Sequence, residues 1–171
     1  VNEELTDQEE SPVDLGSTTG LWVTGDSVIL GIRSKLENKE HISLVNARVG
    51  RQAPELLAVM RVDQSSVPSS PVIFNLGNNN ALSEQTVVEI FEVIKNQPQI
   101  IVVNTAVPRP WRDSNNAIIS KVASRYANVK LVDWDRISKD KPELFAPDGV
   151  HLRPMGSDVY VDLVLSVLVK Q

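Results

Sequence analysis

The chain has 171 residues, of which 42% are hydrophobic and 23% charged, and its formal net charge is −5. This length and composition predict one globular domain with a sizeable core, and the acidic balance argues against a nucleic-acid-binding protein. The absence of cysteine excludes disulfides, thiol catalysis and cysteine-based zinc sites. No apolar run reaches the ~18–20 residues of a membrane span.

The first twenty residues, Val1 to Gly20, differ in character from the rest. They are acidic, rich in Ser, Thr and Gly, and lack apolar periodicity. We expect a disordered linker here, with an engineered extension as the alternative. Because the chain opens without methionine and without a visible signal peptide, we expect it to be part of a longer protein. The folded domain is expected over residues 21–171.

From Leu21 onward, strand and helix patterns alternate. Five short apolar runs predict strands at Leu21–Thr24, Ile42–Asn46, Pro71–Leu76, Ile100–Asn104 and Val129–Asp133. Apolar residues three and four apart predict helices at Val28–Asn38, Pro54–Val62, after Ser83, at Ser114–Ala127 and from Pro154 through Leu168. Five β-α units in series predict an α/β fold, a three-layer αβα sandwich around a five-stranded parallel sheet.

This architecture predicts where chemistry occurs, because open α/β sheets bind ligands beyond the carboxyl ends of their strands. The loops after the first four predicted strands carry Gly25-Asp26-Ser27, Arg48–Arg51, Gly77–Asn80 and Val107–Trp111. A late loop, Asp148–His151, can reach the same rim. We therefore expect the functional residues in these five loops.

Three of these residues fit a serine acyl-transfer site. Serine is a poor nucleophile at neutral pH and needs an adjacent base, which needs an orienting group in turn. Ser27 follows the first predicted strand, and His151 is one of only two histidines in the chain. Asp148 lies three residues before His151, close enough to accept the second imidazole N–H. We expect Ser27 to attack, His151 to carry the proton and Asp148 to fix the tautomer.

An oxyanion that develops during acyl transfer needs preorganised donors. The candidates are the backbone N–H groups of Ser27 and Gly50 and the side-chain amide of Asn79. Gly50 suits this role because glycine lets the backbone approach a substrate closely. Asn78 and Asn80 are chemically able substitutes for Asn79.

The remaining candidates are weaker. Arg109 and Trp111 could line a sugar-binding rim or pack on the surface. Each catalytic candidate also has a structural alternative as a helix cap, a turn residue or a hydrogen-bonded structural histidine. Asp26 is expected to order its loop by hydrogen bonding, and His41 to lie on the surface. Asp133 and Asp135 lack histidine at ligand spacing, so no metal site is expected.

Taken in order, these blocks resemble the four-block signature of the SGNH (GDSL-like) hydrolase superfamily. The blocks are Gly-Asp-Ser at 25–27, the isolated Gly50, Gly-x-Asn at 77–79 and Asp-x-x-His at 148–151. One branch is more similar still, the extracellular catalytic domains of OatA-type peptidoglycan O-acetyltransferases. The stretches that carry this resemblance are Val23–Val28, Ala47–Gln52, Val107–Arg109, Leu131–Trp134 and Phe145–Leu152. It covers about Leu21 to Leu168, and Asn80 departs from it, because the branch often has a small residue after the key Asn.

The resemblance implies a flavodoxin-like SGNH fold and an acetyl-Ser27 intermediate. It implies transfer of acetyl to the C-6 hydroxyl of a peptidoglycan amino sugar, N-acetylmuramic acid more commonly than N-acetylglucosamine. No cofactor or metal is implied. An upstream membrane acyltransferase domain would deliver acetyl from its donor, with the acidic tail as tether, so the location implied is the extracellular face of the cell membrane.

Two other classes remain open at this point. A free-standing SGNH esterase or lipase would use the same residues on acetylated sugars or lipid esters, with water in place of the sugar hydroxyl. The few aromatic residues argue against a lipid substrate. A non-catalytic carbohydrate-binding module would be expected to have lost Ser27, His151 or Asp148, and all three are present.

Overall fold

A five-stranded parallel sheet organises the chain, with the strand order β2-β1-β3-β4-β5. The computed structural model describes residues 19–170, so the predicted linker lies almost wholly outside the described residues. The strands are β1 (Leu21–Gly25), β2 (Ile42–Ala47), β3 (Val72–Asn75), β4 (Ile100–Val103) and β5 (Val129–Val132). The prediction of an α/β fold with a five-stranded parallel sheet is confirmed.

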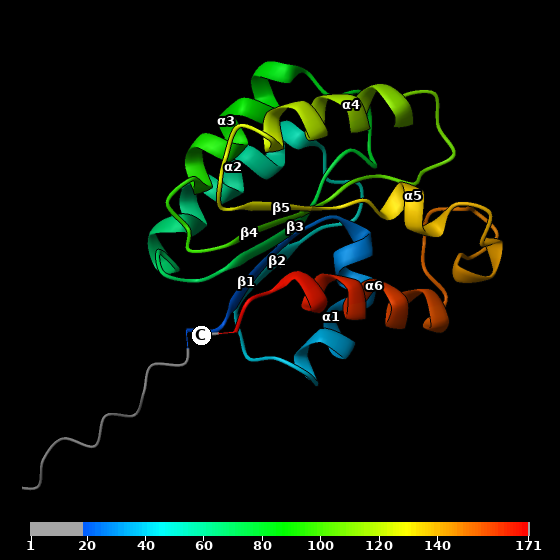
Figure 1. The fold of residues 1–171 in the computed structure, drawn as a ribbon, viewed down its shortest axis with the longest axis horizontal. Coiled ribbons are helices and arrows are strands. Elements are labelled where there is room, and N and C mark those ends of the chain that lie inside the picture. Colours follow the sequence, from blue (N-terminus) through cyan, green and yellow to red (C-terminus); the bar gives the residue numbers. More distant parts are fainter. Residues whose placement is uncertain (1–18, 171) are drawn as a thin grey trace, which may run out of the picture.

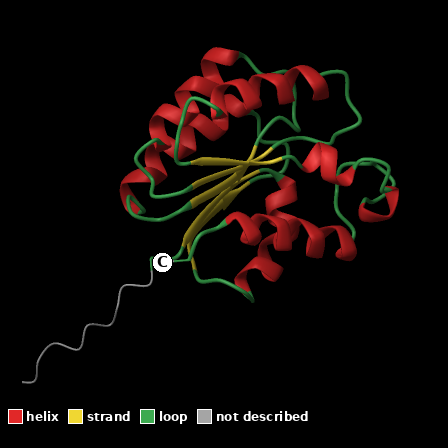
Figure 2. Cartoon of the chain, in the orientation of Figure 1, coloured by secondary structure: helices red, strands yellow, loops and turns green. Residues whose placement is uncertain are grey.

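Helices cover both faces of this sheet (Figure 1). One face carries α1 (Ser27–Glu37) and α6 (Pro154–Val167), and the other carries α2 (Ala53–Asp63), α3 (Glu84–Ile94) and α4 (Arg112–Ala123). The short elements are α5 (Trp134–Ser138) and the 3₁₀ turns η1 (Gln64–Ser66) and η2 (Pro142–Leu144). Figure 2 shows the resulting three layers, with the strands between two groups of helices. None of the helices in residues 19–170 has the length and apolar character needed to cross a bilayer.

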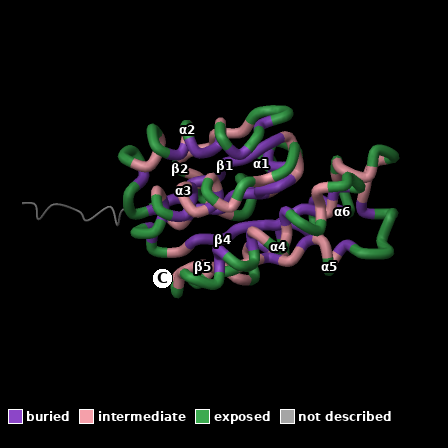
Figure 3. The backbone as a smooth tube through the Cα atoms, turned by 90° about the horizontal axis from the view of Figure 1, so that it is seen from above, coloured by how far each residue is buried: buried purple, intermediate pink, exposed green. Residues whose placement is uncertain are grey.

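The two faces of the sheet bury two separate apolar clusters. Along β3, Val72 and Phe74 point into the cluster under α2, α3 and α4, whereas Ile73 points into the cluster under α1 and α6. This alternation follows from the two-residue period of a strand. The central strands β3 and β4 are buried along their whole length (Figure 3). The sheet is therefore a rigid platform for the loops at its carboxyl edge.

The helix boundaries follow local signals in the sequence. The Ser83 hydroxyl accepts the N–H of Thr86 at 3.1 Å and caps α3 as predicted. Proline occupies the first turns of α2 and α6, where a missing N–H costs no hydrogen bond. These signals set the residue at which each of these three helices begins.

In the C-terminal half, the bounds of one predicted helix were wrong and one short helix was missed. The helix expected at Ser114–Ala127 runs from Arg112 to Ala123 instead. The chain turns after Ala123, and Tyr126 leaves the helix to stack on Phe91 with ring centroids 5.4 Å apart. Helix α5 was not predicted, because five residues are too few to show a helical period.

Candidate active site

Ser27 lies where β1 turns into α1. Gly25 ends the strand with φ +152°, and Asp26 caps the helix by accepting the N–H of Val28 at 2.9 Å. Ser27 is the first helical residue and is half-buried. Its position at a helix N-terminus favours negative charge, since free N–H groups and the positive end of the helix dipole point there.

His151 and Asp148 reach Ser27 from the loop between η2 and α6. His151 Nε2 lies 3.1 Å from Ser27 Oγ, and His151 Nδ1 lies 2.5 Å from Asp148 Oδ2. The loop is tied by its own backbone, since the Ala146 N–H donates to the His151 carbonyl at 2.8 Å. The structure thus brings the three sequence-predicted residues together in the order nucleophile, base and orienting carboxylate.

The Asp148 carboxylate is held in its charged form. The His151 side chain, followed by the backbone N–H groups of Val150 and His151, hydrogen-bonds this carboxylate and lowers its pKa from 3.8 to about 2. Both side chains are open to solvent, with His151 52% and Asp148 45% exposed. The ion pair is therefore accessible to a substrate, and solvent screens it.

Two of the predicted oxyanion donors are backbone groups. The N–H groups of Ser27 and Gly50 have no acceptor within residues 19–170. Gly50 lies in the exposed loop after β2 with φ +73°, a left-handed conformation that glycine adopts without strain. Both groups are therefore available as donors, and their role in binding an oxyanion stays a prediction.

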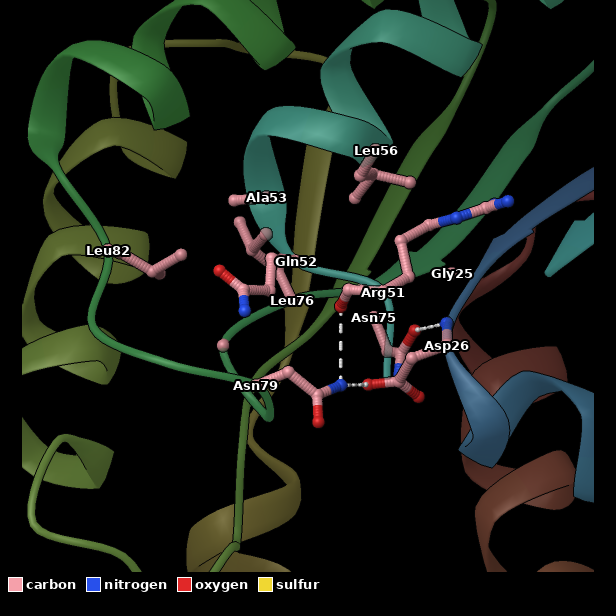
Figure 4. A pocket seen from close by; sticks show the side chains of 11 residues that line it. Gly25, Asp26, Arg51, Gln52, Ala53, Leu56, Asn75, Leu76, Asn79 and Leu82 are labelled. Carbon is pink, nitrogen blue, oxygen red and sulfur yellow. Dashed lines mark hydrogen bonds between the residues drawn. The ribbon is translucent and has the colours of Figure 1, made fainter. Parts of the chain in front are cut away.

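The third predicted donor, Asn79, is already engaged. Its amide nitrogen donates to Asp26 Oδ2 at 3.1 Å and to the Arg51 carbonyl at 3.2 Å (Figure 4). Asn78 also donates to Asp26 Oδ2, at 2.9 Å, whereas Asn80 turns away toward Gln52. Of the three asparagines, Asn78 and Asn79 therefore face the Ser27 turn, and an oxyanion at Asn79 would compete with Asp26 or Arg51.

A groove of about 370 Å³, lined by both polar and apolar side chains, runs along this edge of the sheet. It brings together loops after β2, β3 and β4, with Gly50, Gln52, Asn78, Asn79, Asn80, Val107, Arg109, Trp111 and Val150 as its lining. The Trp111 indole N–H donates to the Asn78 carbonyl at 3.3 Å, which fixes the ring beside the asparagines. Arg109 is exposed in the same groove. Both predicted rim residues therefore line one surface.

One residue that sequence reasoning missed is Asn75, the last residue of β3. Its side-chain oxygen accepts the Asp26 backbone N–H at 3.1 Å, and its side-chain nitrogen donates to Asp26 Oδ1 at 2.6 Å. A single polar residue at the end of the apolar run Val72–Leu76 was the available signal. Such a residue in a buried strand needs a partner.

Potential metal ligands do not gather anywhere in residues 19–170: no three His, Cys, Asp or Glu side chains lie together there. A reaction independent of metal stays a prediction. His41 lies exposed at the start of β2, as expected.

Sequence comparison finds relatives with stated activities, although no protein-family model matches the chain. The chain is 35% identical over 147 residues to the peptidoglycan O-acetyltransferase OatA of Listeria monocytogenes, an alignment of 85% of this chain and 23% of that protein. It is 34% identical over 145 residues to YrhL of Bacillus subtilis, again 84% of this chain and 23% of the relative. The chain thus spans about a quarter of the length of these relatives.

Solved structures with the same fold include both transferases and hydrolases. The C-terminal catalytic domain of Streptococcus pneumoniae OatA superposes with a TM-score of 0.65 at 22% identity, covering 87% of this chain and 92% of that one. A lipase/acylhydrolase from Enterococcus faecalis gives a TM-score of 0.69 at 15% identity, covering 85% and 94%. The chain therefore has the SGNH (GDSL-like) hydrolase fold and belongs among the relatives of the peptidoglycan O-acetyltransferases.

Proposed function

We propose that this chain is the catalytic domain of a peptidoglycan O-acetyltransferase that acetylates the C-6 hydroxyl of N-acetylmuramic acid, with N-acetylglucosamine as the second candidate acceptor. The observation that carries the proposal is the hydrogen-bonded series Ser27–His151–Asp148, open to solvent beside a groove lined by amides. The 35% sequence identity of the chain to the Listeria enzyme supports the same activity.

The first half of the reaction moves acetyl from the donor to Ser27. His151 Nε2 takes the Ser27 proton as Oγ attacks the acetyl carbonyl, while Asp148 holds Nδ1–H and stabilises the imidazolium. The backbone N–H groups of Ser27 and Gly50, with the Asn79 amide, stabilise the oxyanion. The imidazolium then gives its proton to the leaving oxygen of the donor, which leaves acetyl-Ser27.

The second half repeats these steps with a sugar hydroxyl. His151 takes the proton of the C-6 hydroxyl, the sugar oxygen attacks acetyl-Ser27, and Ser27 leaves with the proton from His151. Water at ~55 M competes for the same intermediate. Transfer wins only if the groove orients the sugar, since orientation supplies effective molarities of up to ~10⁵–10⁸ M.

The groove supports a glycan in preference to a lipid. Its side-chain amides offer donors and acceptors, and Trp111 offers a flat face to a sugar ring. A long lipid acyl chain needs an enclosed channel, and this groove is open to solvent. An esterase acting on acetylated sugars is the remaining alternative, because only the acceptor distinguishes it.

Other parts of the reaction belong to partners. We propose that an upstream membrane acyltransferase domain supplies the acetyl group and that residues 1–20 tether the domain to it at the extracellular face of the membrane. The alignment supports such an arrangement, because this chain matches only 23% of the length of each of these two relatives. No cofactor is proposed for the reaction.

The test supplies 4-nitrophenyl acetate as donor with and without muroglycan or chitooligosaccharide acceptors. We expect O-acetyl sugar by mass spectrometry, and we expect Trp111→Ala to shift the ratio of acetyl-sugar to free acetate toward acetate. Trp111→Phe is the matched control, because it keeps an aromatic face while it loses the five-membered ring and the indole N–H that bonds the Asn78 carbonyl. It should retain most of the transfer.

Three outcomes would contradict parts of this proposal. A ratio near zero for every glycan would make the chain an esterase. An unchanged ratio in Trp111→Ala would remove that residue from the acceptor site. Turnover retained in a folded Ser27→Ala variant would reject the serine mechanism itself.

A further inference from the structure

The Asp26 carboxylate is buried, with the residue only 5% exposed, and its acceptor sites are full. Oδ1 accepts the Val28 N–H at 2.9 Å and the Asn75 amide at 2.6 Å. Oδ2 accepts the amides of Asn78 at 2.9 Å and Asn79 at 3.1 Å. A carboxylate offers about four lone-pair sites, so all are occupied. One buried charge therefore joins the Ser27 turn, β3 and the loop after β3.

Asn75 fixes this carboxylate from the neighbouring strand. Its carbonyl oxygen accepts the Asp26 backbone N–H at 3.1 Å while its amide donates to Asp26 Oδ1. The side chain lies over Gly25, where a Cβ would be 1.9 Å from Asn75 Oδ1. Because Asn75 is only 4% exposed, it has no freedom to move aside. Glycine at position 25 is thus the residue that lets Asn75 reach Asp26.

We infer that Asn75 and Asp26 are a pair of positioning residues that set the Ser27 turn and the Asn79 amide in one register. A carboxylate only accepts hydrogen bonds, so Asp26 turns the NH₂ end of Asn79 toward the nucleophile turn. An oxyanion that forms there takes over one of the two N–H bonds that Asn79 gives to Asp26 and to the Arg51 carbonyl. Neither residue touches the reacting atoms. The inference rests on the proposed function, since it assumes that Asn79 serves Ser27.

The fold contains a second copy of this arrangement at the ends of β4 and β5. Asn104, which follows β4, donates to Asp133 Oδ1 at 2.9 Å and accepts the Asp135 N–H at 3.1 Å. Asp133 caps α5 by accepting the Arg136 N–H at 3.1 Å. In both copies an asparagine at a strand end holds a capping aspartate on the adjacent strand. The Asn104–Asp133 pair is therefore a matched control for Asn75–Asp26.

The experiment measures kcat and KM for hydrolysis of 4-nitrophenyl acetate in four variants. Asp26→Asn keeps the helix cap and the bonds on Oδ1, because Asn caps as well as Asp. It places an NH₂ group against the donors of Asn78 and Asn79, so it disturbs the oxyanion side alone. We expect Asp26→Asn and Asn75→Ala to lower kcat about 10- to 100-fold with KM unchanged, as small misplacements near reacting groups do. Asp133→Asn should leave kcat unchanged, and Asn104→Ala, which lies in a small pocket with Val28 and Asn78, should lower kcat less than Asn75→Ala does.

A double-mutant cycle separates positioning from general damage. Asn79→Ala alone is expected to lower kcat by about 10²–10³-fold. If Asp26 acts through Asn79, then Asp26→Asn costs much less in the Asn79→Ala background than in the unaltered chain. Equal fold losses in both backgrounds would overturn the inference. So would a folded Asp26→Asn chain with full kcat, a kcat loss matched by Asp133→Asn, or an Asp26→Asn chain that does not fold.

The aryl acetate needs no glycan acceptor, so this test is separate from the test of the proposed transferase activity. The unaltered chain could hydrolyse the ester through Ser27 and never acetylate a glycan. That result would reject the transferase proposal, and the variants would still test the positioning pair. An unaltered chain with no Ser27-dependent turnover would overturn both.

Discussion

The Asp148 carboxylate divides its two oxygens between two tasks. Oδ2 binds His151 Nδ1 at 2.5 Å, while Oδ1 accepts the backbone N–H groups of Val150 and His151 at 2.9 and 3.0 Å. The second set fixes the carboxylate within its own loop, so the imidazole is oriented by a group that is itself held. In the proposed mechanism the loop from 148 to 151 therefore carries both the base and its orienting group, already hydrogen-bonded to each other beside Ser27.

Asp148→Asn should keep the shape of this loop and lose most of its activity. An amide nitrogen facing His151 Nδ1 favours the wrong imidazole tautomer, and in a serine triad this change lowers kcat by up to about 10⁴-fold. The measurement is kcat for 4-nitrophenyl acetate, with Glu37→Gln as a control for an exposed carboxylate that pairs with Arg33 within α1. A kcat within a few-fold of the unaltered chain would mean that Asp148 does not orient His151.

The pH dependence of activity should reflect His151 alone on the acid side. The pKa of Asp148 falls from 3.8 to about 2 through its hydrogen bonds from His151 and the backbone. Because this pKa is lowered, the stability that Asp148 contributes is present above pH 3.8 and is lost as pH falls through about 2. The contribution is small, since solvent screens a side chain that is 45% exposed. Asp148 is therefore already ionised above pH 3.8.

The measurement is the logarithm of kcat/KM against pH, where we expect a single-proton slope on the acid limb. A two-proton slope above pH 3.8 would show that Asp148 titrates together with His151 and would contradict its lowered pKa.

Among the elements, α1 and α6 have the largest effect on the geometry of the site. Helix α1 begins at Ser27, and α6 begins three residues after His151. They pack side by side on one face of the sheet, and Lys35 joins them by donating to the Pro154 carbonyl at 2.7 Å and to Asp158 at 2.6 Å. The nucleophile and its base therefore hold their 3.1 Å separation only while these helices keep their relative position.

Substitutions of two glycines, one in each of these helices, should change the stability of the fold in opposite directions. A Cβ at Gly156 in α6 would lie 2.0 Å from the Leu144 carbonyl oxygen, so Gly156→Ala must push α6 away from η2. We expect it to lower the free energy of unfolding by about 1–3 kcal/mol and to lower kcat. A Cβ at Gly31 in α1 meets nothing within 4 Å, so Gly31→Ala should raise the free energy of unfolding by about 0.5–1 kcal/mol.

Urea unfolding followed by tryptophan fluorescence gives both values. A Gly156→Ala variant as stable as the unaltered chain would mean that α6 can move away from η2 without cost. A loss of stability in Gly31→Ala would mean that α1 is not limited by glycine there.

Periodicity alone was sufficient to predict the order of the strands and the longer helices along the chain. Each strand is an apolar run, and α1, α2, α3 and α6 keep an apolar face. It was not sufficient where a contact distant in sequence decides a boundary, as at the end of α4, where Tyr126 stacks on Phe91. The same limit applies to the site. The motifs predicted Ser27, His151 and Asp148, but the bond between Asp26 and Asn75 joins residues 49 apart and follows only from the β1–β3 pairing.

At the scale of the whole molecule, the parallel sheet brings four loops to one edge and the rest of the fold supports them. Hydrolases and transferases share this architecture, as the similar structures from Enterococcus and Streptococcus illustrate. The fold by itself therefore does not decide between water and sugar as acceptor, and in the proposed function this choice depends on the groove that contains Arg109 and Trp111.

The most direct measurement of the central claim is the fate of acetyl on Ser27. The protein is mixed with 4-nitrophenyl acetate, quenched in acid at intervals with and without muroglycan, digested, and analysed by mass spectrometry. The account predicts one acetyl group on the peptide that contains Ser27, a shorter lifetime of that group when muroglycan is present, and O-acetyl sugar formed in matching amount. Acetyl found on no residue or on a residue other than Ser27, or an acetyl-Ser27 lifetime that muroglycan leaves unchanged, would contradict it.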